Sequence, residues 1–241
     1  MTRALLLLVL LLALASAVVA FQDYILSKEN RSDLKRLIGF FAANHEENLP
    51  TWFSASLMLI SGILLATIAM LKRTQGAGYV AHWAFLSFVF CLGSVDEVAQ
   101  VHEATMAPLR GALDVGGFLY FAWVIPGGIA LLVLGIAYLG FLRALPAWTR
   151  NRVLLGAALF ISGGFGLELV GGSYREALGA HKTTGYQLLT TAEETLEMLG
   201  LVVFIHALIS YVGREFGEVR VSIDRAVPDH ADTLEAVELP E

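Results

Sequence analysis

Apolar residues along this chain gather into long runs that polar stretches separate. Each run is close to the ~20 residues that a helix needs to cross the hydrocarbon core of a bilayer. The runs cover residues 4–20, 52–71, 79–100, 118–142, 153–170 and 192–211. The alternating ten-residue segments typical of a membrane β-barrel are absent from the sequence. The pattern therefore predicts an all-α fold, a polytopic membrane helix bundle with about six transmembrane helices. Pro126, followed by two glycines, predicts a kink within the fourth run.

The polar stretches divide the chain into four parts. The run that follows Arg3 is leucine-rich and ends in small residues, so it fits either a first transmembrane helix or a cleaved signal peptide. Leu34, Leu37 and Phe41 recur at helical spacing beside charged residues and predict a helix in the outer interface. The expected parts are residues 1–20 (transmembrane helix or signal peptide), 21–51 (extracytoplasmic loop with the interfacial helix), 52–213 (five-helix membrane bundle) and 214–241 (cytoplasmic tail).

Composition and charge narrow the function classes. Hydrophobic residues make up 56% of the chain and charged residues 16%, against ~25% charged in soluble domains. The single cysteine, Cys91, excludes disulfides and thiolate metal clusters within one chain. A net charge of −6 does not favour nucleic-acid binding. The expected partners are membrane lipids and a lipid or other apolar substrate.

Basic residues in the short loops set the expected orientation. Lys72 and Arg73 follow the second run, and three arginines between residues 143 and 152 separate the fourth from the fifth. The positive-inside rule places these loops in the cytoplasm, together with the C-terminal tail. Four basic residues between 28 and 36 would then lie outside, against the rule. The expectation is a multi-pass protein of the cell membrane with a cytoplasmic C-terminus.

Seven acidic side chains and one histidine lie inside or at the ends of the apolar runs. They are Asp96, Glu97, His102, Glu103, Glu168, Glu193, Glu194 and Glu197. An ionisable group within a transmembrane helix costs at least ~2.5 kcal/mol, so such groups are usually paired and functional. With the third and fifth runs directed outward and the sixth inward, all eight would lie in the outer third of the bilayer. We therefore expect one carboxylate and histidine site there.

The third run has a polar stripe. At 100° per residue, Asp96, Gln100 and Glu103 lie within about 60° of one another, while Glu97 is about 100° from Asp96. A regular helix would not direct Glu97 and His102 into one ligand shell, although a helix end or distortion near Glu103 would turn His102 inward. One alternative is that His102 and Glu103 lie at a solvated helix terminus. Another is that Asp96 and Glu97, which lie deeper, form only structural hydrogen bonds.

Glycines flank Glu168, and the sixth run begins with an acidic group. Gly164 precedes Glu168 by one turn and Gly171 follows it, which favours close approach of a partner from a neighbouring helix. The alternative is a neutral, hydrogen-bonded carboxyl. A helix dipole would explain Glu193 if the helix began there, but it explains the deeper Glu197 less well.

Clustered carboxylates repel one another, so a metal ion or shared protons should compensate them. Carboxylates with a histidine suit zinc, iron or manganese, whereas all-oxygen ligation would suit calcium or magnesium. The Glu-x-x-His motif of di-iron bundles is missing. His206 lies about 13 Å from Glu197 along a helix and His82 is also remote, while His45 and His181 are outer-loop candidates. All eight side chains are candidate metal ligands, and Asp96, Glu97, Glu168 and Glu197 are the candidate catalytic residues.

Three strings resemble a family of small bacterial multispanning membrane proteins. They are Ser94-Val95-Asp96-Glu97 with His102-Glu103, Gly166-Leu167-Glu168-Leu169-Val170-Gly171-Gly172, and Glu193-Glu194-Thr195-Leu196-Glu197-Met198-Leu199-Gly200. The resemblance implies no activity. Ser94, Asp96 and His102 also resemble, more distantly, the intramembrane hydrolase superfamily of alkaline ceramidases. The His-x-x-x-His motif of that superfamily is absent from this sequence.

Three functions remain open at this point. The site could belong to a metal-dependent enzyme that acts on a lipid or apolar substrate in the outer leaflet, with the metal as Lewis acid. It could instead bind or transport a cation or protons. The buried acids could also specify helix pairing in a non-catalytic assembly subunit.

Overall fold

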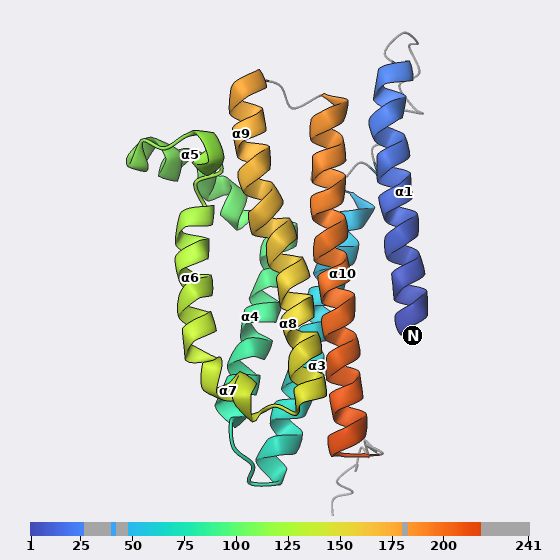
Figure 1. Cartoon of the computed structure of the whole chain (residues 1–241), viewed down its shortest axis with the longest axis vertical. Helices are drawn as coiled ribbons and strands as arrows, with labels where there is room; N and C mark the ends of the chain where they lie inside the picture. The colour runs from blue at the N-terminus through green and yellow to red at the C-terminus, as the bar shows by residue number, and fades with distance from the viewer. Residues whose placement is uncertain (27–39, 42–47, 180–182, 218–241) are drawn as a thin grey trace, which may run out of the picture.

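The computed structural model describes residues 1–26, 40–41, 48–179 and 183–217 (Figure 1). These residues form helices joined by short connections, and no strand occurs among them. The all-α fold predicted from the hydropathy pattern is confirmed. Residues 34–39 of the predicted interfacial helix, and most of the C-terminal tail, lie outside the described residues.

Most of the helices run along the long axis of the molecule (Figure 1). They are α1 (Thr2–Leu26), α3 (Leu49–Thr74), α4 (Val80–Ala99), α5 (Val101–Leu113), α6 (Val124–Ala137), α7 (Leu139–Ala144), α8 (Ala147–Ile161), α9 (Glu168–Leu178) and α10 (Thr184–Glu215). A π-helical turn, Ser162–Leu167, joins α8 to α9, and a 3₁₀ turn, Gly117–Leu119, precedes α6.

Five helices are long and apolar enough to cross a membrane. They are Thr2–Phe21, Leu49–Thr74, Val80–Ala99, Ala147–Leu178 and Thr184–Glu215. The fourth predicted run is shorter as a helix, since α6 ends at Ala137 and the six-residue α7 follows it. Large apolar side chains such as Phe88 on α4 and Leu132 on α6 are exposed, with fractions of 57% and 64%. Such faces suit contact with lipid, and the five helices are compatible with a multi-pass membrane protein.

The structure corrects the position of the break in the fourth run. Pro126 was expected to kink a helix, but it lies in the first turn of α6, where a missing N–H removes no intrahelical bond. The chain instead bends at Tyr138, the residue that ends α6 and precedes α7.

Two other helices extend beyond their apolar runs. α10 begins at Thr184, and its N-cap residue, Thr183, accepts a hydrogen bond from the Tyr186 N–H at 3.2 Å. α9 continues to Leu178, where Gly179 ends it in the left-handed conformation (φ 60°). The connection between the last two long helices is therefore much shorter than the loop expected between residues 171 and 191.

α10 is the central helix of the bundle, packed against α1, α3 and α8. The contact with α8 is close because Gly156 and Gly200 face each other: a Cβ on Gly200 would lie 2.7 Å from the Gly156 carbonyl oxygen. One core cluster joins Val9 of α1 and Leu57 of α3 to Met198 of α10. A second core cluster joins Trp83 of α4 and Phe141 of α7 to Leu208 of α10. α7 lies near the lower end of the bundle in Figure 1.

Candidate functional site

One cavity of about 750 Å³ lies among α3, α4, α5, α9, α10 and the π-helical turn. All eight ionisable side chains singled out in the sequence line it: Asp96, Glu97, His102, Glu103, Glu168, Glu193, Glu194 and Glu197. The structure therefore brings residues from three distant parts of the chain to one hollow, and the cavity holds a possible acidic cluster. Within the cavity these eight side chains divide into smaller groups.

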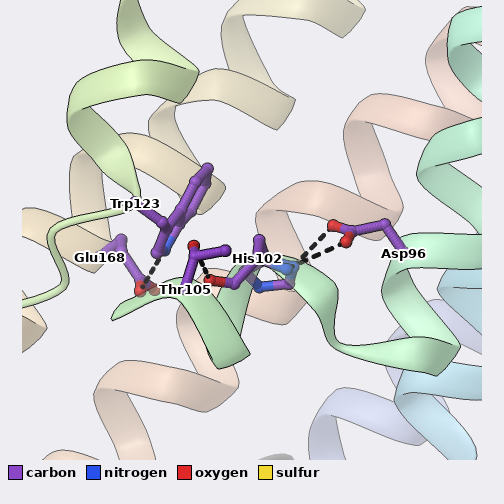
Figure 2. Close-up of polar contacts among 5 residues, drawn as sticks. All are labelled: Asp96, His102, Thr105, Trp123 and Glu168. Atoms are coloured by element: carbon purple, nitrogen blue, oxygen red, sulfur yellow. Dashed lines mark hydrogen bonds and ion pairs between the residues drawn. The ribbon is translucent and has the colours of Figure 1, made fainter. Parts of the chain in front are cut away.

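A break in the helix creates the first group. Gln100 adopts the left-handed conformation (φ 55°, ψ 37°), so α4 ends at Ala99 and α5 starts at Val101 in a new direction. The Asp96 carboxylate spans this break: Oδ1 accepts from the His102 backbone N–H at 3.1 Å, and Oδ2 lies 2.6 Å from the His102 ring Nδ1 (Figure 2). The distortion that the sequence required to turn His102 inward is present, three residues earlier than expected.

The Asp96–His102 pair fixes the state of the imidazole. An ionised carboxylate only accepts hydrogen bonds, so Nδ1 must donate to it. The other ring nitrogen, Nε2, is then left to exchange a proton. The ring also packs edge-on against Trp123, with 5.0 Å between ring centres.

The second group is a triad of carboxylates: Glu97 from α4 with Glu194 and Glu197 from α10. One oxygen from each lies within 4.8 Å of the others, a spacing that fits coordination of a single metal ion. Oε2 of Glu194 is buried and has no hydrogen-bond partner among the described residues. A buried carboxylate oxygen without a partner costs free energy, and a cation would satisfy it.

Glycines allow the triad to form. The π-helical turn carries Gly163 and Gly164 directly against α10. A Cβ on Gly163 would lie 2.8 Å from the Glu193 carbonyl oxygen, and one on Gly164 would lie 2.5 Å from Glu197 Oε1. Single π-helical turns often occur at functional sites. Here the turn lets the Glu197 side chain lie directly against the backbone of Gly164, where any larger residue would clash with it.

The third group involves Glu168, which the structure does not place in the triad. Its Oε1 accepts a hydrogen bond from Trp123 Nε1 at 3.0 Å (Figure 2). This partner belongs to another segment, as the flanking glycines indicated. Glu193 of α10 lines the same cavity, and two carboxyl groups that approach each other can share a proton.

The helix-dipole explanation for Glu193 is wrong. α10 begins at Thr184, so Glu193 lies more than two turns inside the helix, beyond the reach of the N-terminal dipole. The alternative proposed for His102 and Glu103 is partly correct, because both lie in the first turn of α5, and both also line the cavity.

Two cavity residues of other chemistry, Arg175 and Trp123, were not among the predicted site residues. Arg175, which the apolar runs placed in a loop, belongs to α9, and its guanidinium carbon lies 5.4 Å from the Phe121 ring centre. Its positive charge offsets part of the acidic group. Trp123 was part of an apolar run, and its signal was the indole N–H, which needs an acceptor when buried.

The remaining histidines divide as the spacing indicated. His206 hydrogen-bonds Thr2 through Nδ1 at 3.1 Å, and the His82 ring stacks on Phe141. Neither lines the cavity. His45 and His181 lie outside the described residues.

Comparison with known proteins places the chain in a family without giving it a function. Residues 4–212 match the model of a domain of unknown function (DUF8692), and the chain belongs to that family. No curated protein and no solved structure matches it.

Proposed function

We propose that the triad of Glu97, Glu194 and Glu197 binds a divalent metal ion, and that the cavity is the active site of a metal-dependent membrane enzyme acting on a lipid or other apolar substrate. The observation that carries the proposal is the convergence of three carboxylate oxygens within 4.8 Å, one of the carboxylates having a buried oxygen without a partner. A bound metal would supply a Lewis acid and an activated water in such a site.

The donor set favours manganese over zinc and iron. All three oxygens come from carboxylates, while His102 is engaged with Asp96. Carboxylate and water ligands suit manganese, magnesium and calcium, whereas zinc and iron favour sites that include imidazole. Asp96, His102, Glu103, Glu168 and Glu193 then surround the metal without binding it.

The Asp96–His102 pair supplies the acid–base function that such an enzyme needs. Asp96 orients the ring through Nδ1, so Nε2 can accept or deliver a proton in the cavity. Asp96 and His102 pair across the break between α4 and α5, and neither belongs to the triad. Metal binding and proton transfer are therefore separate parts of one site.

The lining favours an amphiphilic substrate. Cavities of ~300–1,000 Å³ accommodate small organic ligands. Met58, Val89, Phe160 and Phe165 give this cavity an apolar part, beside the carboxylates and Arg175. A hydrocarbon chain would occupy the apolar part and place its polar group at the metal. The distribution of basic loops supports an outer-leaflet position in the cell membrane, with the C-terminus in the cytoplasm.

Metal affinity in two neighbouring variants tests the proposal. Glu194→Gln removes one anionic ligand, while Glu193→Gln makes the same chemical change on the same helix outside the triad. By isothermal titration with Mn²⁺, Glu194→Gln should weaken binding by at least the ~10-fold seen for outer-shell changes. Glu193→Gln should stay within about 3-fold of the unmodified protein (roughly 0.7 kcal/mol). Equal effects of both changes, or no binding in the unmodified protein, would refute the triad as a metal site.

The pair formed by Glu168 and Glu193 favours a second candidate, a proton-handling protein. The two carboxyls, from α9 and α10, line the same cavity, and paired carboxyls inside a membrane protein can carry a proton without any metal. In that case Glu168→Gln in reconstituted vesicles should reduce proton flux, whereas Mn²⁺ should bind neither the variant nor the unmodified protein.

A further inference from the structure

A second arrangement of charged side chains lies at the opposite end of the bundle from the cavity. Trp148 is in the first turn of α8, and two guanidinium groups pack on its indole ring: Arg152 at 3.7 Å and Arg214, from the last turn of α10, at 4.0 Å from the ring centre. Arg152 also donates to the Trp148 carbonyl oxygen at 3.4 Å. We refer to Arg152 and Arg214 as the Trp148 arginine pair.

The charges of the Trp148 arginine pair are not offset by an acid in the described part of the chain. The acid next in sequence, Glu215, forms its ion pair with Lys72 at 3.2 Å. Two guanidinium groups held on one ring repel each other, and stacking on an indole is worth only ~0.5–2 kcal/mol per cation. An anion that accepts hydrogen bonds from both groups would remove this repulsion, and phosphate suits the planar donors of arginine.

The surroundings of the pair resemble a lipid-facing surface at the membrane boundary. Leu154 and Leu155 follow Arg152 on α8 and are 47% and 52% exposed. Helix α1 does not cover the lower end of α10: its N-terminal end lies well above that end in Figure 1, and Thr2 contacts His206 instead. Charged groups at the end of two spanning helices lie at headgroup depth, next to apolar side chains at hydrocarbon depth.

We infer that the Trp148 arginine pair binds the phosphate of an anionic phospholipid, whose acyl chains lie along Leu154 and Leu155 of α8. A net anionic lipid matches the two positive charges, whereas a zwitterionic lipid brings its own cation. The inference does not depend on the proposed metal site, because the two lie at opposite ends of the bundle.

Lipid binding to the purified protein tests the inference. The unmodified protein in detergent is titrated with phosphatidylglycerol or phosphatidylcholine, and bound lipid is counted by native mass spectrometry. The variant Arg152→Gln/Arg214→Gln removes the pair. The matched control is Arg73→Gln/Arg143→Gln, which removes two exposed arginines that lie near the same end and do not contact Trp148. A third variant, Trp148→Leu, keeps both charges but removes the ring that holds them.

The expected results distinguish a specific phospholipid site from nonspecific attraction by surface charge. Phosphatidylglycerol should bind in preference to phosphatidylcholine, and loss of the pair should weaken its binding at least ~10-fold, because each guanidinium would lose a charge-assisted hydrogen bond to the phosphate. The control should change binding less than about 3-fold, because its arginines contribute only surface charge that salt screens. Trp148→Leu should fall between the two. Equal losses in the pair variant and the control would overturn the inference, as would equal binding of both lipids. Displacement of the lipid by millimolar inorganic phosphate would overturn the assignment to a lipid. Melting curves in the same detergent should show that all variants fold, and a variant that does not is replaced by Arg152→Gln alone.

Discussion

Substitution of Gly164 by alanine should detach one ligand from the metal triad without disturbing the fold. The new Cβ would lie 2.5 Å from Glu197 Oε1, and ordinary contact begins at 3.4 Å, so the oxygen must retreat by about 0.9 Å. The obstructing atom is the far end of a flexible side chain rather than backbone, so the carboxylate moves and the helices stay in place.

That displacement is large for coordination chemistry. Metal–ligand distances in proteins hold to within about ±0.2 Å. Loss of Glu197 from the triad should therefore weaken Mn²⁺ binding at least ~10-fold, about 1.4 kcal/mol. Isothermal titration of the purified variant measures this directly.

Gly166→Ala is the matched control for the Gly164 variant. It lies in the same π-helical turn, and its new Cβ would meet only Ser162 Cβ, at 3.9 Å. Its Mn²⁺ affinity and its melting temperature should match those of the unmodified protein. If Gly164→Ala binds Mn²⁺ as tightly as Gly166→Ala, Glu197 is not a ligand and the reasoning from the triad fails.

Three further expectations follow from the packing, the helix break and the orientation. Gly200→Ala places a Cβ 2.7 Å from the backbone atoms Gly156 O and Phe160 N, so it should lower the free energy of unfolding by ~1–3 kcal/mol in a thermal melt. Gly213→Ala, whose Cβ meets nothing within 4 Å, should not. Equal melting temperatures of the two variants would show that the helices separate freely. Asp96→Ala removes the acceptor of both His102 hydrogen bonds, so amide hydrogens at the start of α5 should exchange with solvent faster, with a loss of local stability of ~1.5–3 kcal/mol. A loss of Mn²⁺ binding as large as that of Glu194→Gln would instead place Asp96 among the metal ligands. Cysteines introduced at residues 150 and 182 should be labelled from the cytoplasmic and the outer side respectively, and labelling of both from one side would refute the orientation.

Hydropathy predicted the helical bundle well because the hydrocarbon core imposes its own length on each span. It could not locate the ends of α9 and α10, since helices continue into the interface, where polar residues are as acceptable as apolar ones. That difference matters for Glu193: once α10 starts at Thr184, the residue becomes an interior acid that the helix dipole does not explain. The kink expected at Pro126 was wrong for a different reason: in an apolar run, a proline in the first turn of a helix cannot be distinguished from one that kinks a helix.

The sequence identified the residues around the cavity but not their partners. A helical wheel assumes a regular helix through residue 103, whereas the chain turns at Gln100 in a left-handed conformation that glutamine adopts rarely. This turn joins Asp96 to His102 and leaves Glu97 to face α10. The close approach of Glu197 also depended on a π-helical turn, and nothing in the glycine-rich string distinguishes that turn from ordinary helix packing.

Electron paramagnetic resonance of the unmodified protein with bound Mn²⁺ reports directly on whether the triad binds a metal. We expect one tightly bound ion per chain. Its spectrum should show hyperfine coupling to the protons of bound water and none to a directly bound nitrogen, because the triad contains only carboxylates. Coupling to a ligand nitrogen would place His102 on the metal and contradict its pairing with Asp96. The absence of any bound ion would contradict the metal site itself.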